Sequence, residues 1–125
     1  MQDLVRIGDH WETGFEAMRS LLTSSEPPSA VFVASDIVAL GALRAIKSAE
    51  LRVPQDLAIV GFDDIPLAEH ISPPLTTVRV PAQELGSTAA RMLLEMIQTG
   101  KRPPSVVLKT ELMVRESCGA YLNSS

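Results

Sequence analysis

The side chains best suited to chemistry in this sequence are carboxylates that directly follow short apolar runs. An ionised carboxylate accepts hydrogen bonds from pairs of hydroxyl or N–H groups, and it binds them more strongly in a cleft that excludes water. This chemistry suits a sugar or a nucleobase as the ligand. The carboxylates in question are Asp9, Asp36, Asp63 and Asp64, and the hydroxyl of Ser35 stands beside the second of them.

Several of these candidates also have ordinary structural explanations. Asp36 precedes a long apolar segment, where an aspartate caps a helix more often than it contacts a ligand. Asp63 and Asp64 precede an Ile-Pro dipeptide at 65–66 rather than a clear helix, so capping explains them less well, and Asp63 is the stronger ligand candidate. The indole of Trp11 is able to stack on a sugar ring or a purine, although a partly buried aromatic is an equally ordinary explanation.

Nothing in the sequence forms a catalytic set. It has no Ser-x-x-Lys, no Gly-x-Ser-x-Gly, no phosphate loop and no histidine near a candidate nucleophile. The pair Asp63 and Asp64 lacks a positioned second group for acid–base work. Cys118 is the only cysteine, and His10 and His70 have no ligand-spaced neighbours, so we expect no disulfide, metal site or cofactor. We therefore predict a binding protein rather than an enzyme.

Length and charge narrow the class further. A chain of 125 residues with 46% apolar and 21% charged residues is typical of one globular domain or one lobe. Eleven basic against fifteen acidic residues leave no basic surplus for phosphate contacts, so we do not expect this chain alone to bind DNA. No apolar segment approaches the about 20 residues that span a membrane, and no secretory signal is evident, so we expect a cytoplasmic protein.

The elements that position these residues alternate between strand and helix patterns. This alternation is typical of an open parallel sheet flanked by helices, in which the carboxyl ends of the strands share one edge. The run 30–34 predicts a strand buried on both faces. Strands are expected at 4–7, 30–34, 57–62, 76–80, 106–108 and 112–114, helices from a capping box at 13–16, at 37–49 and over 85–97, and a proline-rich loop at 65–75.

Six blocks of the sequence occur in the order found in the LacI/GalR family of bacterial transcriptional regulators. The chain therefore resembles the C-terminal part of the effector-binding region of that family, whose fold is similar to that of periplasmic sugar-binding proteins. The resemblance extends over residues 8–119. The blocks are 28–36, 39–45, 51–57, 60–64, 73–79 and 111–117.

The resemblance implies roles for individual residues. Asp63 matches the carboxylate that contacts the effector, Ser35 matches a hydrogen-bonding position that is commonly Asn, and Trp11 looks like the aromatic that stacks on the ligand. Together with Asp36 and Phe62 they form the expected ligand-binding set. The resemblance also implies a sugar or nucleobase effector, a homodimer, and DNA contact only through an N-terminal domain. A transport-linked sugar-binding protein of the same fold is the alternative.

The resemblance also predicts how the chain is divided. Residues 1–120 are expected to form a partial effector-binding domain without the helix-turn-helix, and 121–125 a frayed tail. The helix at about 84–98 would belong to a missing first lobe. Its apolar stripe is too costly to leave in water, at about 1.5–3 kcal/mol per large side chain, so we expect it to fold back on the sheet or to pack against a second chain. The stripe comprises Leu85, Ala89, Met92, Leu93, Met96 and Ile97.

Overall fold

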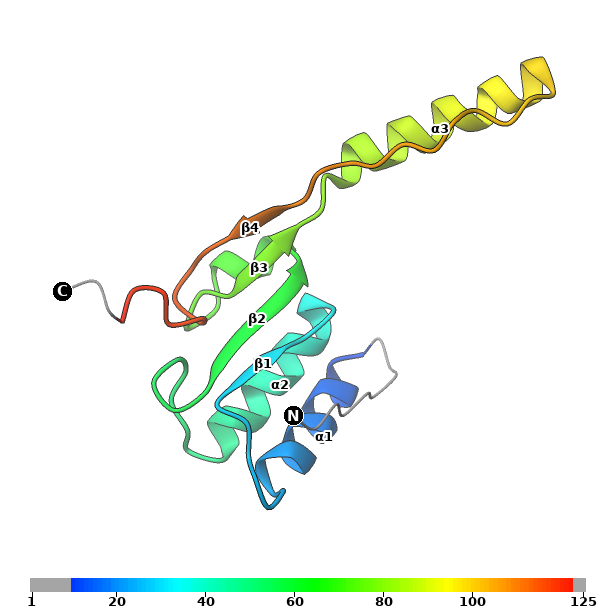
Figure 1. The fold of residues 1–125 in the computed structure, drawn as a ribbon. Helices are drawn as coiled ribbons and strands as arrows, with labels where there is room; N and C mark the ends of the chain where they lie inside the picture. The colour runs from blue at the N-terminus through cyan, green and yellow to red at the C-terminus, as the bar shows by residue number, and fades with distance from the viewer. Residues whose placement is uncertain (1–9, 123–125) are drawn as a thin grey trace. The chain divides into compact units, whose positions relative to one another are not determined.

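A computed structural model describes residues 10–122 of the chain (Figure 1). It divides into two compact units: the sheet unit contains the residues up to Arg79 and those from Leu112 onward, and the α3 unit is Val80–Glu111. The predicted strand at 4–7 and Asp9 lie outside the described residues. The elements are α1 (Trp11–Leu22), β1 (Ala30–Phe32), α2 (Asp36–Ser48), β2 (Ala58–Asp63), the 3-10 helix η1 (Pro66–Glu69), β3 (Thr76–Arg79), α3 (Ala82–Thr99) and β4 (Glu111–Met113).

The strands form one open sheet in the order β1-β2-β3-β4. The pairs β1–β2 and β2–β3 are parallel, and the register of the second pair places Asp63 opposite Arg79. In Figure 1 the arrow of β4 runs opposite to that of β3. The predicted open sheet with flanking helices is confirmed, but it is mixed rather than wholly parallel, because β4 is the returning strand of a chain that left along β3.

β1 differs most from its prediction. It has three residues, and the side chain of Phe32 is 63% exposed, so the expected burial on both faces is wrong. The physical reason is that β1 is an edge strand of the sheet in the described part of the chain, and a strand at an edge has neighbours on one side only. The segment 106–108 is not a strand, and within residues 10–122 only β4 follows α3.

The two helices of the sheet unit cross closely. α1 begins at Trp11, two residues before the predicted capping box, and packs mainly against α2. A Cβ on Gly14 would collide with the carbonyl group of Val38, and a Cβ on Gly41 would collide with that of Trp11, so only glycine allows this approach. The buried core beneath the crossing is made of Met18, Ala39, Ala42, Ala45, Ile46, Leu57, Ile59, Ala68 and Leu75.

The segment after β4 joins the sheet near its centre. The buried hydroxyl of Ser117 donates to the carbonyl of Ile59 at 2.7 Å and accepts from the N–H of Thr76 at 2.8 Å. The N–H of Ile59 donates in turn to the carbonyl of Ser117 at 2.9 Å. Tyr121 and Leu122, the first residues of the predicted tail, lie in a turn in which the N–H of Leu122 donates to the carbonyl of Gly119.

The α3 unit consists of a long helix and the extended segment that runs back beside it (Figure 1). α3 ends at Thr99, and Gly100 adopts the left-handed conformation with φ 68°, as its glycine predicts. Thr88 is the only buried residue of the helix. The exposed large apolar side chains of this unit are Leu85, Leu93, Leu94, Met96, Ile97, Val106 and Val107.

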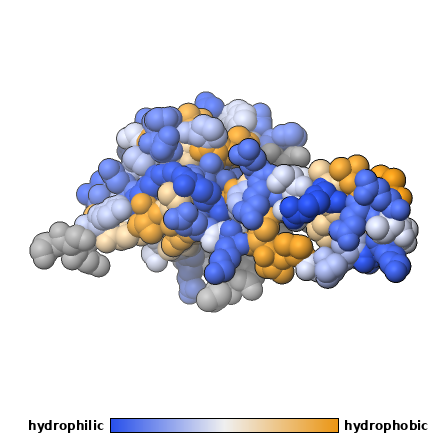
Figure 2. Space-filling model, turned by 90° about the horizontal axis from the view of Figure 1, so that it is seen from above, coloured by the Kyte–Doolittle hydropathy of each residue, from blue (hydrophilic) through white to orange (hydrophobic). Residues whose placement is uncertain are grey.

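Apolar side chains also reach the surface elsewhere. Figure 2 shows one face of the molecule on which hydrophobic patches lie among hydrophilic residues. No helix within residues 10–122 is both long and apolar enough to cross a membrane.

Candidate functional site

The carboxyl ends of three neighbouring strands carry polar residues. Asp63 ends β2, Arg79 ends β3, and Ser35 follows β1 by three residues. Because β1, β2 and β3 are parallel neighbours, these three residues lie along one edge of the sheet, where ligands bind in open α/β folds. Ser35 is half-buried, and its hydroxyl makes no capping hydrogen bond to α2, so it remains available to a ligand.

The carboxylate of Asp63 has no partner in the described part of the chain. Asp63 is exposed, and among residues 10–122 it makes neither a hydrogen bond through its side chain nor an ion pair. Its backbone has φ 114°, a region that residues other than glycine adopt at a cost of about 1–3 kcal/mol. The fold therefore holds an unused carboxylate in a strained backbone position at the edge. Phe62, which precedes it, is half-buried in β2 opposite Val78.

Asp36 has a different role from those predicted. The N-cap of α2 is Ser35, and Asp36 is the first helical residue, with a completely buried side chain. Its Oδ1 accepts from the hydroxyl of Thr77 at 2.7 Å, and its Oδ2 accepts from the N–H of Ile65 at 3.0 Å. Gly61 makes room for it, since a Cβ there would collide with Oδ1. Both oxygens are occupied within the chain, which argues against a direct ligand contact.

Asp64 is likewise occupied. Its Oδ1 accepts from Nη2 of Arg115 at 2.7 Å, its Oδ2 accepts from Nε of Arg79 at 2.6 Å, and its side chain is 6% exposed. Burial on its own would raise the pKa of Asp64, but the hydrogen bonds from Arg115 and Arg79 outweigh it and hold this pKa below the usual value. Asp64 is therefore ionised, and the pair Asp63 and Asp64 offers only one free carboxylate.

Trp11 contacts the second helix, α2. The guanidinium carbon of Arg44 is 5.0 Å from the centre of its ring, so the indole packs on α2. Arg44 lies eight residues beyond Asp36, which is about 12 Å along the helix axis at 1.5 Å per residue. The stacking of Trp11 on a ligand stays a prediction, and the structure places its ring beside Arg44, where α1 begins.

Three residues of this region were not predicted from the sequence. Thr77 bonds Asp36 across 41 positions and Arg115 bonds Asp64 across 51, separations at which residue spacing carries no signal. Arg79 had a weak signal, because it lies near the end of the strand predicted at 76–80. These three residues bind the carboxylates of Asp36 and Asp64, whereas none of them binds the carboxylate of Asp63.

Comparisons with known proteins place the chain in a family. Residues 3–118 match the model of the periplasmic binding protein-like domain, so the chain belongs to that family. The chain is 45% identical over 119 residues to the HTH-type transcriptional regulator CelR of Thermobifida fusca, covering 93% of this chain and 35% of CelR. It thus spans about a third of the length of that relative.

Solved structures agree with the sequence comparison. The structure of a transcriptional regulator CelR–cellobiose complex matches with a TM-score of 0.81 and 44% identity, over 86% of this chain and 33% of that one. A LacI family transcriptional regulator from Enterococcus faecalis V583 with bound ribose matches with a TM-score of 0.79 and 32% identity, over 87% of this chain and 40% of that one. The chain is therefore part of the effector-binding region of a LacI-family regulator.

Proposed function

We propose that this chain is the C-terminal part of a module that senses a sugar or nucleoside-like effector, and that Asp63 and Ser35 contact the effector from the edge of the sheet. The observation that carries the proposal is the exposed, unpartnered carboxylate of Asp63 beside the occupied carboxylates of Asp36 and Asp64. A carboxylate accepts two hydroxyl donors, as neighbouring hydroxyls of a sugar ring or a ribose provide. The CelR complex contains cellobiose and the Enterococcus faecalis regulator contains ribose, which supports this ligand class.

The proposal extends to the whole regulator. Effector binding closes a first lobe over this edge and biases the DNA-binding geometry of a cytoplasmic homodimer, whose DNA contacts come from a separate domain. The apolar side chains of α3 are covered in that assembly by the first lobe or by a second chain. Their exposure in the α3 unit supports this, because a stripe of large apolar side chains is costly to leave in water.

Regulation is favoured over the two rival functions. The relatives reported above are transcriptional regulators, which favours a regulator over the transport-linked sugar-binding protein of the same fold. They also support a protein that is not an enzyme. The ion pairs of Asp64 leave Asp63 without a second free carboxylate, which an acid–base pair requires.

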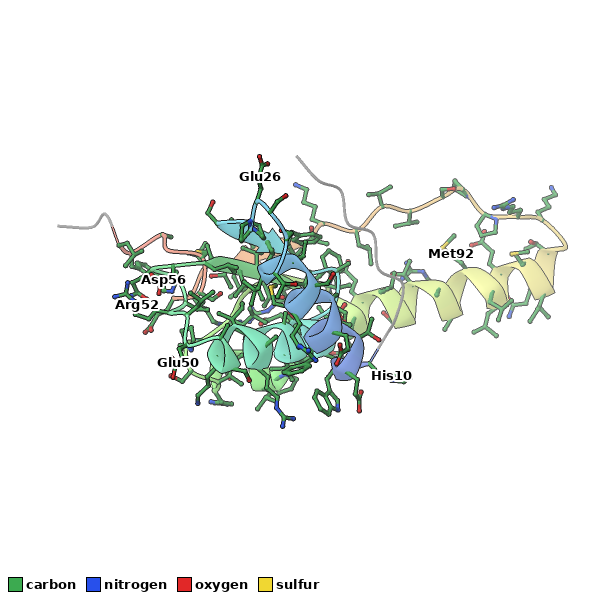
Figure 3. The ribbon with its side chains drawn as sticks, turned by 90° about the horizontal axis from the view of Figure 1, so that it is seen from below. His10, Glu26, Glu50, Arg52, Asp56 and Met92 are labelled. Carbon is green, nitrogen blue, oxygen red and sulfur yellow. The ribbon has the colours of Figure 1, made fainter. Side chains whose placement is uncertain are left out.

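The test is calorimetric titration of the chain with cellobiose, ribose and adenosine. We expect Asp63→Asn to weaken the ligand that binds by about tenfold or more, because a hydrogen bond to a charged group contributes about 1.5–3 kcal/mol. Asp56→Asn is the matched control, since Asp56 is paired with Arg52 at the surface (Figure 3) and should leave affinity unchanged. Equal affinity of the parent and Asp63→Asn would contradict the role of Asp63, and no binding of any probe would contradict the effector class.

A further inference from the structure

Asp64 binds one residue where the chain leaves the sheet unit and one residue shortly after the chain returns to it. Arg79 is the last residue before the α3 unit, and its Nε donates to Oδ2 of Asp64. Arg115 lies three residues beyond Leu112, where the chain returns, and its Nη2 donates to Oδ1. Each oxygen of one carboxylate therefore holds one of the two connections.

Arg115 is itself fixed by further contacts. Its backbone N–H donates to the hydroxyl of Thr76 at 2.8 Å, and its Nη1 donates to the carbonyl of Leu75 at 2.8 Å. Its side chain is 14% exposed, so these bonds are shielded from competition by water. A movement of Asp64 therefore displaces Arg115 together with the start of β3, rather than only rotating a flexible side chain.

Asp64 also controls the backbone of Asp63. Both residues have positive φ, 114° at Asp63 and 55° at Asp64, and such a pair of non-glycine residues persists only when its surroundings hold it. The surroundings here are the N–H of Asp64, which donates to the hydroxyl of Thr77 at 3.3 Å, and the two ion pairs of its side chain. The contacts of Asp64 thus set the direction of the free carboxylate of Asp63.

We propose that Asp64 is a positioning residue, which fixes the carboxylate of Asp63 at the effector edge and transmits a displacement of Asp63 to the strand ends at Arg79 and Arg115. This inference rests on the proposed function of Asp63. It adds a route by which the effector acts on the two connections to the α3 unit. The sequence gives no sign of this route, since the three partners are joined only in the folded chain.

Neutralising Asp64 is the direct test, because its charge holds both arginines. The charged groups around it are Arg79 from β3, Arg115 from the segment after β4, Asp63 from β2, and Asp36 from α2 through the hydroxyl of Thr77. Loss of the Asp64 charge therefore leaves two cations without their shared anion.

The experiment follows the backbone amide signals of Asp63, Val80 and Leu112 by NMR from neutral pH to about pH 2. In the parent we expect the three signals to move with one shared midpoint below the usual aspartate pKa. Asp64→Asn should lack this transition. The control Asp56→Asn should retain it, although Asp56 also has a low pKa, about 2, which its hydrogen bonds from Arg52 produce. The proposal would be overturned if the signals of Val80 and Leu112 did not share the midpoint of the Asp63 amide signal. It would also be overturned if the transition persisted in Asp64→Asn.

A second comparison at neutral pH keeps the test decisive if acid unfolds the chain. There, Asp64→Asn should shift the signals of Val80 and Leu112 from their parent positions, whereas Asp56→Asn should not. Titration of Arg115→Lys and Arg115→Met with ribose tests whether the charge at residue 115 positions Asp63 through Asp64. We expect the lysine variant to bind ribose more tightly than the methionine variant. Equal ribose affinity of the parent and Asp63→Asn would refute only the effector role of Asp63, because the shared pH transition is measured without ligand.

Discussion

Replacing Asp36 with alanine separates three roles that a carboxylate can have at the start of a helix. The side chain is fully buried and accepts from the hydroxyl of Thr77 and the N–H of Ile65. Alanine leaves the buried hydroxyl of Thr77 and the half-buried N–H of Ile65 without an acceptor, and each loss costs about 1–3 kcal/mol. We therefore expect Asp36→Ala to lower the free energy of unfolding by about 3–5 kcal/mol.

The competing roles predict much smaller losses. A side chain that only caps the helix costs about 1 kcal/mol when removed, and an exposed carboxylate reserved for a ligand changes stability by less than about 0.5 kcal/mol. Asp36→Asn is the matched control, because its amide accepts from Ile65 N–H and donates to the oxygen of Thr77. It should recover about half of the lost stability.

The assay is urea unfolding of the parent, Asp36→Ala, Thr77→Val and the double variant. The double-mutant cycle should give a coupling of about 1.5–3 kcal/mol, the value of a hydrogen bond to a charged group. The slope against urea must be the same in all four proteins for the comparison to hold. A loss below about 1 kcal/mol in Asp36→Ala, or additive single changes, would refute the buried-anchor interpretation.

Three further predictions concern other parts of the chain. Gly41→Ala should lower the melting temperature by the equivalent of several kcal/mol, because the new Cβ collides at the helix crossing. Gly86→Ala has open space around it and should raise the free energy of unfolding by about 0.5–1 kcal/mol. Equal melting temperatures of these two variants would exclude the close crossing of α1 and α2. The lowered pKa of Asp64 means that the stability it provides is complete above the usual aspartate pKa and is lost as pH falls through the lowered value, so the urea midpoint of the parent should fall more steeply in acid than that of Asp64→Asn, and parallel profiles would count against the ion pairs. In sedimentation velocity, the fraction of dimer should rise with concentration for the parent, and a variant with Leu94→Glu and Ile97→Glu should stay monomeric. A parent that is monomeric at every concentration would show that the apolar face of α3 does not pair in this chain.

Local patterns were sufficient to predict the elements that lie close in sequence. The apolar run at 57–62 followed by Asp63 predicted the end of β2 within one residue, and Gly100 predicted the left-handed end of α3. Glu50, which directly follows the helix predicted at 37–49, has φ 59°, a left-handed conformation. These predictions depend on backbone conformation within a few residues, which the local sequence determines.

The use of each carboxylate depended on partners that are distant in sequence. Nothing near Asp36 indicates that Thr77 will occupy it, and nothing near Asp64 indicates Arg115. The apolar run of β1 suggested burial on both faces, yet a run of this kind carries no information on whether a neighbouring strand is present.

The hydrogen bonds of Ser117 have a consequence for how the protein is made. Ile59 finds its partner 58 residues later in the chain, so a growing polypeptide that has completed β2 has no Ser117 to bond. At about 5–20 residues per second, synthesis supplies that serine about 3–12 s later. During this interval the central strands expose unpaired groups of the sheet to the crowded surroundings of the ribosome. Protection of these strands by a chaperone, or slow translation after them, would affect the yield of folded protein more than its final stability.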